Sequence, residues 1–180
     1  EYHLPLINQF QVQERVGLTF ARALRTLLRQ DPDIIMVGEI RDEETARTAI
    51  QAALTGHLVF STLHTNDAVS IVPRLVDLGL SRVSIAGSLR GVVAQRLMRK
   101  LCTHCAVPWQ PSAQDLKAAQ LPLDTHGTFF KAVGCAHCRD TGYRGRKAVS
   151  EILLMDDTLR DLIVTRAVKG FWLETSHFAN

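Results

Sequence analysis

Residues 31–49, DPDIIMVGEIRDEETARTA, contain an apolar run that ends in a carboxylate. The run from Ile34 to Val37 lies between a turn and Gly38, which predicts a strand buried on both faces. Glu39 follows at the carboxyl end of that strand. Open α/β sheets bind their ligands at this end, where a carboxylate can hold a water or a magnesium ion. The residues around Glu39 decide between such a site and a solvent-exposed strand end.

Helices and strands are predicted to alternate over residues 1–100. Asp42 is a suitable N-cap and Gly56 a suitable terminator for a helix after the first strand. A second strand is predicted over 57–64, HLVFSTLH. Periodicity predicts three further helices, over 18–29, from Asp67 to Leu78, and over 82–100. This order of elements indicates an α/β fold with a parallel sheet.

Two histidines lie at the ends of the second predicted strand. His57 precedes its apolar run and His64 follows it. The segment STLHTND (61–67) also gathers hydroxyl, amide and carboxylate groups at the carboxyl end of the strand. If this strand lies beside the strand that carries Glu39, these groups share one edge of the sheet. The chemistry favours a phosphate-facing site over two structural histidines.

The composition is that of an ordinary globular protein. Of the 180 residues, 46% are hydrophobic and 22% are charged, enough for one domain with a core or for two small ones. The net charge of +3 is too small to indicate nucleic acid or an acidic membrane by itself. No apolar run approaches the roughly 18 residues that span a bilayer. Because residue 1 is Glu, we expect the sequence to begin inside a longer protein.

From residue 101 the sequence changes character. Prolines and two close cysteine pairs mark a small, loop-rich subdomain, with a short helix predicted over 113–120. GYRGRKAVSEILLM (142–155) predicts a turn and a strand, and DDTLRDLIV (156–164) predicts a capped helix. The inward face of that helix is expected to carry Leu159, Leu162 and Ile163.

The cysteines form the most specific local pattern in the sequence. They form two C-x2-C pairs separated by 29 residues: Cys102, Cys105, Cys135 and Cys138. Four thiolates at this spacing suit a tetrahedral zinc ion, because each pair places two sulfurs on one side of the metal. Such a closed site has no open coordination position, so the zinc is expected to fold a subdomain and not to catalyse.

Three other interpretations of the cysteines stay open. The pairs could form disulfides, although nothing in the sequence indicates an oxidising compartment. They could hold iron in a rubredoxin-like site. His104 or His137, inside the pairs, could replace a thiolate as ligand.

Residues 18–68, LTFARALRTLLRQDPDIIMVGEIRDEETARTAIQAALTGHLVFSTLHTNDA, resemble the core of the type II secretion and type IV pilus assembly ATPases. The strand ending in GE (38–39) is similar to the Walker B element of that family, and GHLVFSTLH (56–64) to its His box. EYHLP (1–5) is similar to the tail of its Asp box. The cysteine pairs followed by GYRGR (142–146) are similar to the metal-binding subdomain of the assembly ATPases.

The resemblance implies roles for five residues. Glu39 would orient the attacking water near the γ-phosphate of ATP, directly or through Mg²⁺. Glu1, in the Asp box, would be a second acidic group for water or metal. His57 and His64 would sense the γ-phosphate and signal its loss to the neighbouring subunit. Arg41 would bridge the site and the subunit interface, unless it only pairs with Asp42 or Glu43.

The resemblance reaches about residue 165 and implies three parts. Residues 1–100 would belong to a RecA-like P-loop ATPase core, 101–141 to a tetracysteine zinc subdomain, and 142–180 to a strand and helix with an atypical tail. The implied cofactors are ATP, Mg²⁺ and a structural Zn²⁺. The implied assembly is a homo-hexamer that meets secretion or pilus platform proteins at the cytoplasmic face of the inner membrane.

Two features depart from the family pattern. No GxxxxGK[ST] loop occurs, and residues 168–180, VKGFWLETSHFAN, do not match the family's continuation. The N–H groups and the lysine of that loop supply most of the contacts to the phosphates. The chain is therefore predicted to be a motor fragment that is inactive alone.

A basic zinc-ribbon module for nucleic acid is the rival interpretation. Basic residues flank the cysteines at Arg96, Arg99, Lys100, Arg139, Arg144, Arg146 and Lys147. Aromatic residues are sparse near these charges and the net charge is small, and both observations disfavour nucleic acid. No nucleic-acid partner is expected. A docking role of the metal subdomain at the inner membrane is compatible with the motor.

Overall fold

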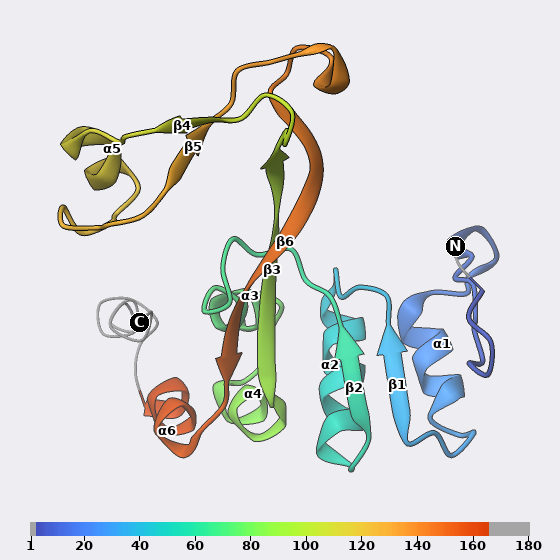
Figure 1. Cartoon of the computed structure of the whole chain (residues 1–180). Coiled ribbons are helices and arrows are strands. Elements are labelled where there is room, and N and C mark those ends of the chain that lie inside the picture. Colours follow the sequence, from blue (N-terminus) through green and yellow to red (C-terminus); the bar gives the residue numbers. More distant parts are fainter. Residues whose placement is uncertain (1–2, 166–180) are drawn as a thin grey trace. The chain divides into compact units, whose positions relative to one another are not determined.

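The computed structural model describes residues 3–165 (Figure 1). They divide into two compact units, one formed by the residues up to Ala94 and from Glu151 onward, the other by Gln95–Ser150. The first unit contains η1 (Glu14–Val16), α1 (Phe20–Leu27), β1 (Ile34–Val37), α2 (Glu43–Leu54), β2 (Leu58–Ser61), α3 (Ile71–Asp77), α4 (Arg82–Ser88) and α6 (Asp157–Thr165).

The strands β1 and β2 pair in parallel, with Val37 opposite Ser61. The helix α2 connects them, and its N-cap is Asp42, whose side chain accepts a hydrogen bond of 2.8 Å from the N–H of Thr45. On its inner face α2 buries three small residues, Ala46, Ala49 and Ala52. Small side chains let a helix approach the strands closely. The predicted α/β fold with a parallel sheet is confirmed (Figure 1).

One face of the β1–β2 pair is open in the described part of the chain. On that face, Ile34 and Met36 of β1 are 63% and 72% exposed, while the alternate positions of β1 are buried. Leu58 and Phe60 of β2 are 45% and 53% exposed. The prediction of a strand buried on both faces is therefore wrong for residues 3–165. A continuous apolar run shows that a strand can be covered on both sides, but it does not show which segment supplies the cover.

The helices of the first unit share one apolar core with the inner face of the strand pair. Leu24 of α1 and Ile85 of α4 are both almost fully buried in the shared apolar core. The helix α6 packs on α4, where Nη1 of Arg160 donates to the carbonyl of Ala86 at 3.1 Å. Ile163 of α6 is 4% exposed, as its place on the inward face predicts. The predicted helical C-terminal segment is thus present up to Thr165, and the predicted atypical tail lies outside the described residues.

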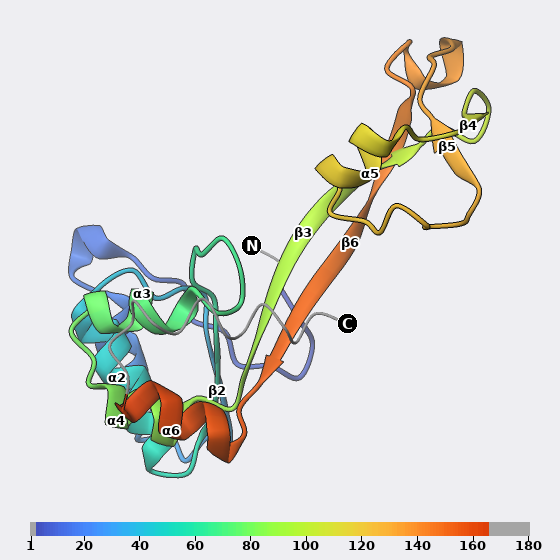
Figure 2. The ribbon, with the colours of Figure 1, turned by 90° about the vertical axis from the view of Figure 1, so that its left-hand side faces the viewer.

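Residues 82–100 do not form the single helix that their periodicity predicts. The helix α4 ends at Ser88, and β3 (Gly91–Leu101) follows and pairs with β6 (Tyr143–Leu154) (Figure 2). The adjacent β-branched residues Val92 and Val93 favour extended backbone. The partner strand lies more than 40 residues away in the sequence, so local periodicity carries no sign of this pairing.

The second unit contains a small antiparallel strand pair and one short helix. The strands β4 (Val107–Trp109) and β5 (Phe129–Lys131) pair antiparallel. The helix α5 (Ala113–Ala118) confirms the helix predicted over 113–120. The remaining element is η2 (Ala136–Cys138). None of the helices in residues 3–165 is long and apolar enough to cross a membrane.

Candidate active site and metal centre

The carboxyl end of the β1–β2 pair brings together Glu39, Arg41 and His64. Oε2 of Glu39 lies 2.6 Å from Nε of Arg41 and 3.7 Å from Nε2 of His64. The Glu39 side chain is 21% exposed, whereas those of Arg41 and His64 are 71% and 91% exposed. A sheltered carboxylate thus lies beside two nitrogen groups that face solvent and can bind an anionic ligand.

Thr62 joins the ends of the two strands beyond their last paired residues. Its Oγ1 donates to the carbonyl of Gly38 at 2.6 Å, and its carbonyl accepts from the N–H of Ile40 at 3.0 Å. Because Ile40 is also buried, the backbone is held on both sides of Glu39. Thr62 is not among the predicted site residues. The hydroxyl-rich run at the end of β2 is the signal that could have identified it.

Arg41 pairs with Glu39 although three other carboxylates, of Asp42, Glu43 and Glu44, follow it in the sequence. Glu44 is paired with Arg25. Asp42 is engaged as the N-cap of α2. Glu43 accepts a hydrogen bond of 2.7 Å from Nε of Arg47. With these carboxylates bound elsewhere, the guanidinium of Arg41 is directed to the site and not along the surface of α2.

The remaining predicted site residues are placed differently. His57 immediately precedes β2, and its Nδ1 lies 2.9 Å from the carbonyl of Ala52 and 3.3 Å from Oγ1 of Thr55. The four residues of β2 span roughly 13 Å, so His57 and His64 lie at opposite ends of the strand. Glu1 lies outside the described residues.

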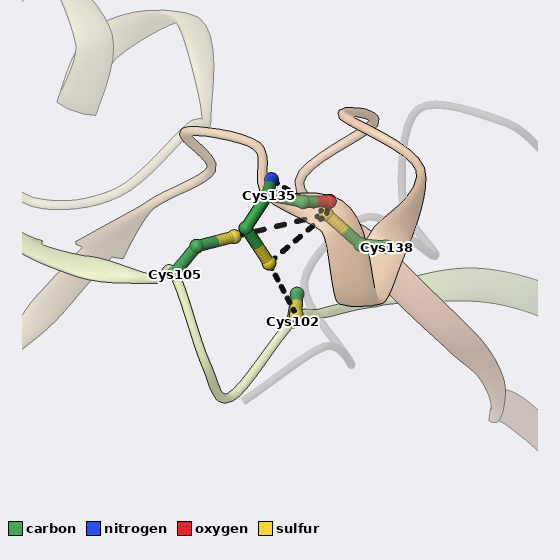
Figure 3. Close-up of side chains that lie close together, drawn as sticks. All are labelled: Cys102, Cys105, Cys135 and Cys138. Carbon is green, nitrogen blue, oxygen red and sulfur yellow. Dashed lines mark hydrogen bonds between the residues drawn. The ribbon is translucent and has the colours of Figure 1, made fainter.

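The four cysteines converge in the second unit (Figure 3). Sγ of Cys102 lies 3.9 Å from Sγ of Cys135, and Sγ of Cys105 lies 3.8 Å from Sγ of Cys138. All four sulfurs lie within 4.8 Å of one another. Disulfide-bonded sulfurs are about 2.05 Å apart, so these cysteines are free thiols. Zn–S bonds of about 2.3 Å in a tetrahedron separate the sulfurs by about 3.8 Å, so the cluster has the size that zinc requires.

Backbone hydrogen bonds hold the second cysteine pair in place. The N–H groups of Cys135 and Gly142 each donate to Sγ of Cys138 at 3.2 Å. The carbonyl of Gly142 in turn accepts from the N–H of Cys102 at 2.9 Å. A Cβ on Gly142, where φ is +74°, would lie 2.7 Å from Cβ of Ala132. Only glycine therefore fits at the first position of GYRGR.

Two of the thiols have opposite pKa shifts. Burial raises the pKa of Cys105 to about 11. Burial also opposes ionisation of Cys138, but hydrogen bonds from the N–H groups of Cys135 and Gly142 outweigh it and lower the pKa of Cys138 to about 6. The metal-free cluster therefore carries a thiolate near neutral pH, which is the form of cysteine that binds metal.

The two histidines inside the cysteine pairs contact each other. The rings of His104 and His137 stack with centroids 4.1 Å apart and planes 13° from parallel. Within residues 3–165, the group able to hold a metal ion consists of the four cysteines. The structure therefore gives no support to a histidine ligand.

Comparison with known proteins identifies the family of the chain. A model of the type II/IV secretion system protein family matches residues 1–176. The chain belongs to this family. The resemblance recognised in residues 18–68 is thereby confirmed.

Several members of the type II/IV secretion family are similar over most of the chain. It is 52% identical over 166 residues to the type IV pilus assembly ATPase PilB of Thermus thermophilus, covering 91% of this chain and 19% of that protein. It is 50% identical over 167 residues to the type II secretion system ATPase E of Vibrio cholerae, covering 93% of this chain and 33% of that protein. The chain thus spans a third or less of the length of these relatives.

Solved structures of a pilus retraction motor and of an ATPase share the fold. The crystal structure of the pilus retraction motor PilT with bound ADP matches with a TM-score of 0.54 and 33% identity, covering 81% of this chain and 32% of that one. The ATPase DotB of Legionella pneumophila matches with a TM-score of 0.54 and 27% identity, covering 83% of this chain and 31% of that one. The chain therefore belongs to a family of ATPases.

Proposed function

We propose that this chain is part of a hexameric, ATP-hydrolysing motor that powers type II protein secretion or type IV pilus assembly. The observation that carries the proposal is the meeting of Glu39 and His64 at the carboxyl edge of β1 and β2, where sheets of this type bind their ligands. Membership of a family whose relatives are named ATPases supports the same conclusion.

Glu39 is the residue best placed to orient the attacking water or the shell of a magnesium ion. Its carboxylate is partly sheltered, and its backbone is fixed by the hydrogen bonds of Thr62. His64, beside Glu39, senses the γ-phosphate. Arg41 reaches from the site toward solvent, where a neighbouring subunit would lie. Glu1 of the Asp box adds the second acidic group.

His57 has a different place in the proposed motor. Because it lies at the amino end of β2, it acts through the strand and not by direct contact with the same phosphate as His64. Its Nδ1 lies 2.9 Å from the carbonyl of Ala52, which belongs to the last turn of α2. In this proposal, a displacement of His64 is transmitted to His57 through one short strand, β2.

The proposed cofactors are ATP and Mg²⁺ at the strand edge and a structural zinc ion at the cysteines. The zinc ion would be held by the four thiolates and would stabilise the fold of the second unit. We assign no catalytic role to it, because four protein ligands complete a tetrahedral site. As parts of the motor chain we propose the three sequence regions 1–100, 101–141 and 142–180, whose limits differ from those of the two compact units.

The proposed partners are other copies of the protein and the platform proteins of the inner membrane, met on the cytoplasmic face. A nucleic-acid module is disfavoured by the placement of Tyr143. Cζ of Arg99 lies 4.1 Å from the centroid of the Tyr143 ring, so one face of this aromatic ring is already occupied by a cation. Base stacking would have to compete with that contact.

A chimera tests the proposal. In this chimera, our chain replaces the matching segment of the Vibrio cholerae ATPase E, which is 33% of that protein, and the rest of that ATPase is kept. We expect the chimera to hydrolyse ATP, and the isolated chain neither to hydrolyse ATP nor to bind it tightly. The missing phosphate loop accounts for the difference. Micromolar affinity of the isolated chain for ATP in calorimetry would contradict the proposal, and DNA binding that weakens steeply with salt would favour the nucleic-acid module.

A further inference from the structure

A buried peptide group in the loop between β2 and α3 depends on a distant carboxylate. Ala68 is fully buried, four residues after His64. Its N–H donates to Oε2 of Glu151 at 3.2 Å. Glu151 lies 83 positions later in the sequence, in β6. Both residues belong to the first compact unit.

This contact satisfies a requirement of the buried backbone. A backbone N–H that is removed from water needs an acceptor, and leaving it unpaired costs as much as a lost hydrogen bond. A carboxylate is a stronger acceptor than a neutral oxygen. Glu151 therefore fixes the place of the Ala68 peptide group relative to β6.

The loop that contains Ala68 is tied together internally. Oγ1 of Thr65 donates to the carbonyl of Asp67 at 3.0 Å, and Oδ1 of Asp67 accepts from the N–H of Ser70 at 2.7 Å. Residues 65–70 therefore behave as one short, hydrogen-bonded turn. A constraint at Ala68 is consequently a constraint on the whole turn.

The turn begins directly after His64, whose own side chain is 91% exposed. So exposed a side chain has little packing of its own to hold it near Glu39, 3.7 Å away. Its position therefore depends on the backbone on either side of it. Thr62 supplies the anchor before His64, and Glu151 supplies the anchor after it.

We propose that Glu151 is a positioning residue for His64: through the N–H of Ala68 it holds the turn that keeps the imidazole beside Glu39. This inference rests on the proposed function, in which Glu39 and His64 act on the same nucleotide. Glu151 itself touches no nucleotide in this scheme. Its loss should lower kcat while the KM for ATP changes little, because the phosphate loop and not the turn provides most of the binding.

The first test measures amide hydrogen exchange in the 180-residue chain by NMR. Glu151→Ala removes the acceptor, whereas Glu151→Gln keeps an amide oxygen in its place. We expect exchange at Ala68 to accelerate about tenfold or more in Glu151→Ala and to stay near the wild-type rate in Glu151→Gln. The N–H of Ile40, bonded to Thr62, is the internal reference and should not change. Glu14→Ala, at an exposed glutamate of η1, is the matched control.

Two exchange results would overturn the inference. One is an unchanged rate at Ala68 in Glu151→Ala. The other is an equal acceleration at Ala68 and Ile40, because this would show that Glu151 stabilises the whole unit and not the turn.

The second test measures ATP turnover of the chimera. We expect Glu151→Ala to lower kcat about tenfold with the KM for ATP within about twofold, and Glu151→Gln to restore most of the rate. A wild-type kcat in Glu151→Ala, in a chimera that Glu39→Gln inactivates, would overturn the role of Glu151 and leave the proposed function standing. Full turnover in Glu39→Gln would instead overturn the proposed function and, with it, the role of Glu151.

Discussion

The guanidinium of Arg41 and the carboxylate of Glu39 form an ion pair of 2.6 Å at the carboxyl end of β1. The Arg41 side chain is 71% exposed and the Glu39 side chain 21%, so the ion pair is accessible to solvent. Surface pairs of this kind contribute only about 0–1 kcal/mol to stability. A polyphosphate that approaches the strand edge can therefore replace Glu39 as the partner of Arg41 with little loss of stability. The Glu39 carboxylate would then be available to bind water or a metal ion.

Arg41 is expected to serve turnover and not folding. In the chimera, Arg41→Ala should lower ATP turnover at least about tenfold, because a cation near the phosphates and the neighbouring subunit is lost. In the isolated chain, the same change should alter the free energy of unfolding by less than about 1 kcal/mol. Steady-state kinetics and urea unfolding measure the two effects. Arg29→Ala, outside the site, serves as the control, and equal turnover of both variants would refute the role.

Glu39→Gln tests the carboxylate itself. The substitution keeps the size and hydrogen-bonding shape of the side chain but removes the charge that orients water or metal. We expect turnover of the chimera to fall by roughly two orders of magnitude or more. ATP affinity should be kept or increased, because one negative charge near the triphosphate is gone. Wild-type turnover would mean that Glu39 is only a solvent-exposed strand end; Glu14→Gln controls for the substitution.

The cysteine cluster is expected to bind one zinc ion per chain. Metal analysis of protein purified without added metal should find zinc and four sulfur ligands at about 2.3 Å by X-ray absorption. Cys135→Ser should abolish zinc binding and unfold the second unit, because four-ligand sites supply folding free energy directly. The β1–β2 pair should keep its amide protection in this variant. Iron, two disulfides, or a chain without metal would each contradict the prediction.

The thiols of the metal-free chain should titrate in a distinctive order. The pKa of Cys138 is lowered to about 6, so its thiolate should form as the pH rises through about 6 and should be lost below it. The pKa of Cys105 is raised to about 11, so this thiol should stay protonated at neutral pH. Thiolate absorbance near 240 nm, recorded under reducing conditions after chelation of the metal, follows both steps. Cys138→Ser should remove the first step, and its persistence would assign that step to another group.

The open face of the β1–β2 pair should make the isolated chain self-associate. Met36 and Phe60 expose apolar side chains from adjacent strands on that face. Changing both to threonine keeps residues that favour strands and removes apolar surface. We expect this double variant to bind less of a hydrophobic dye and to sediment more nearly as a monomer. Val83→Thr, an exposed apolar site on α4, is the control that should change neither property.

Short-range patterns were sufficient to predict the strand–helix–strand unit and the clustering of the four cysteines. The run from Ile34 to Val37, the Asp42 cap and the 57–64 strand each depend on neighbours within a few residues, so their signals are local. The signal of the C-x2-C pairs is likewise local, because the short turn within each pair places its two sulfurs close together. For the same reason the sequence placed Glu39 at a strand end.

The tertiary structure decided what distant parts of the chain do to one another. Residues 91–101 have apolar residues at helical spacing but form the strand β3, because they pair with β6. Which face of β1 is covered depends on helices packed from elsewhere in the chain, and not on the apolar run itself. The contact between Ala68 and Glu151 joins residues 83 positions apart, and no periodicity spans such a distance. Sequence patterns report the preferences of neighbouring residues, whereas these contacts arise only when folding brings separate segments together and buries the polar groups between them.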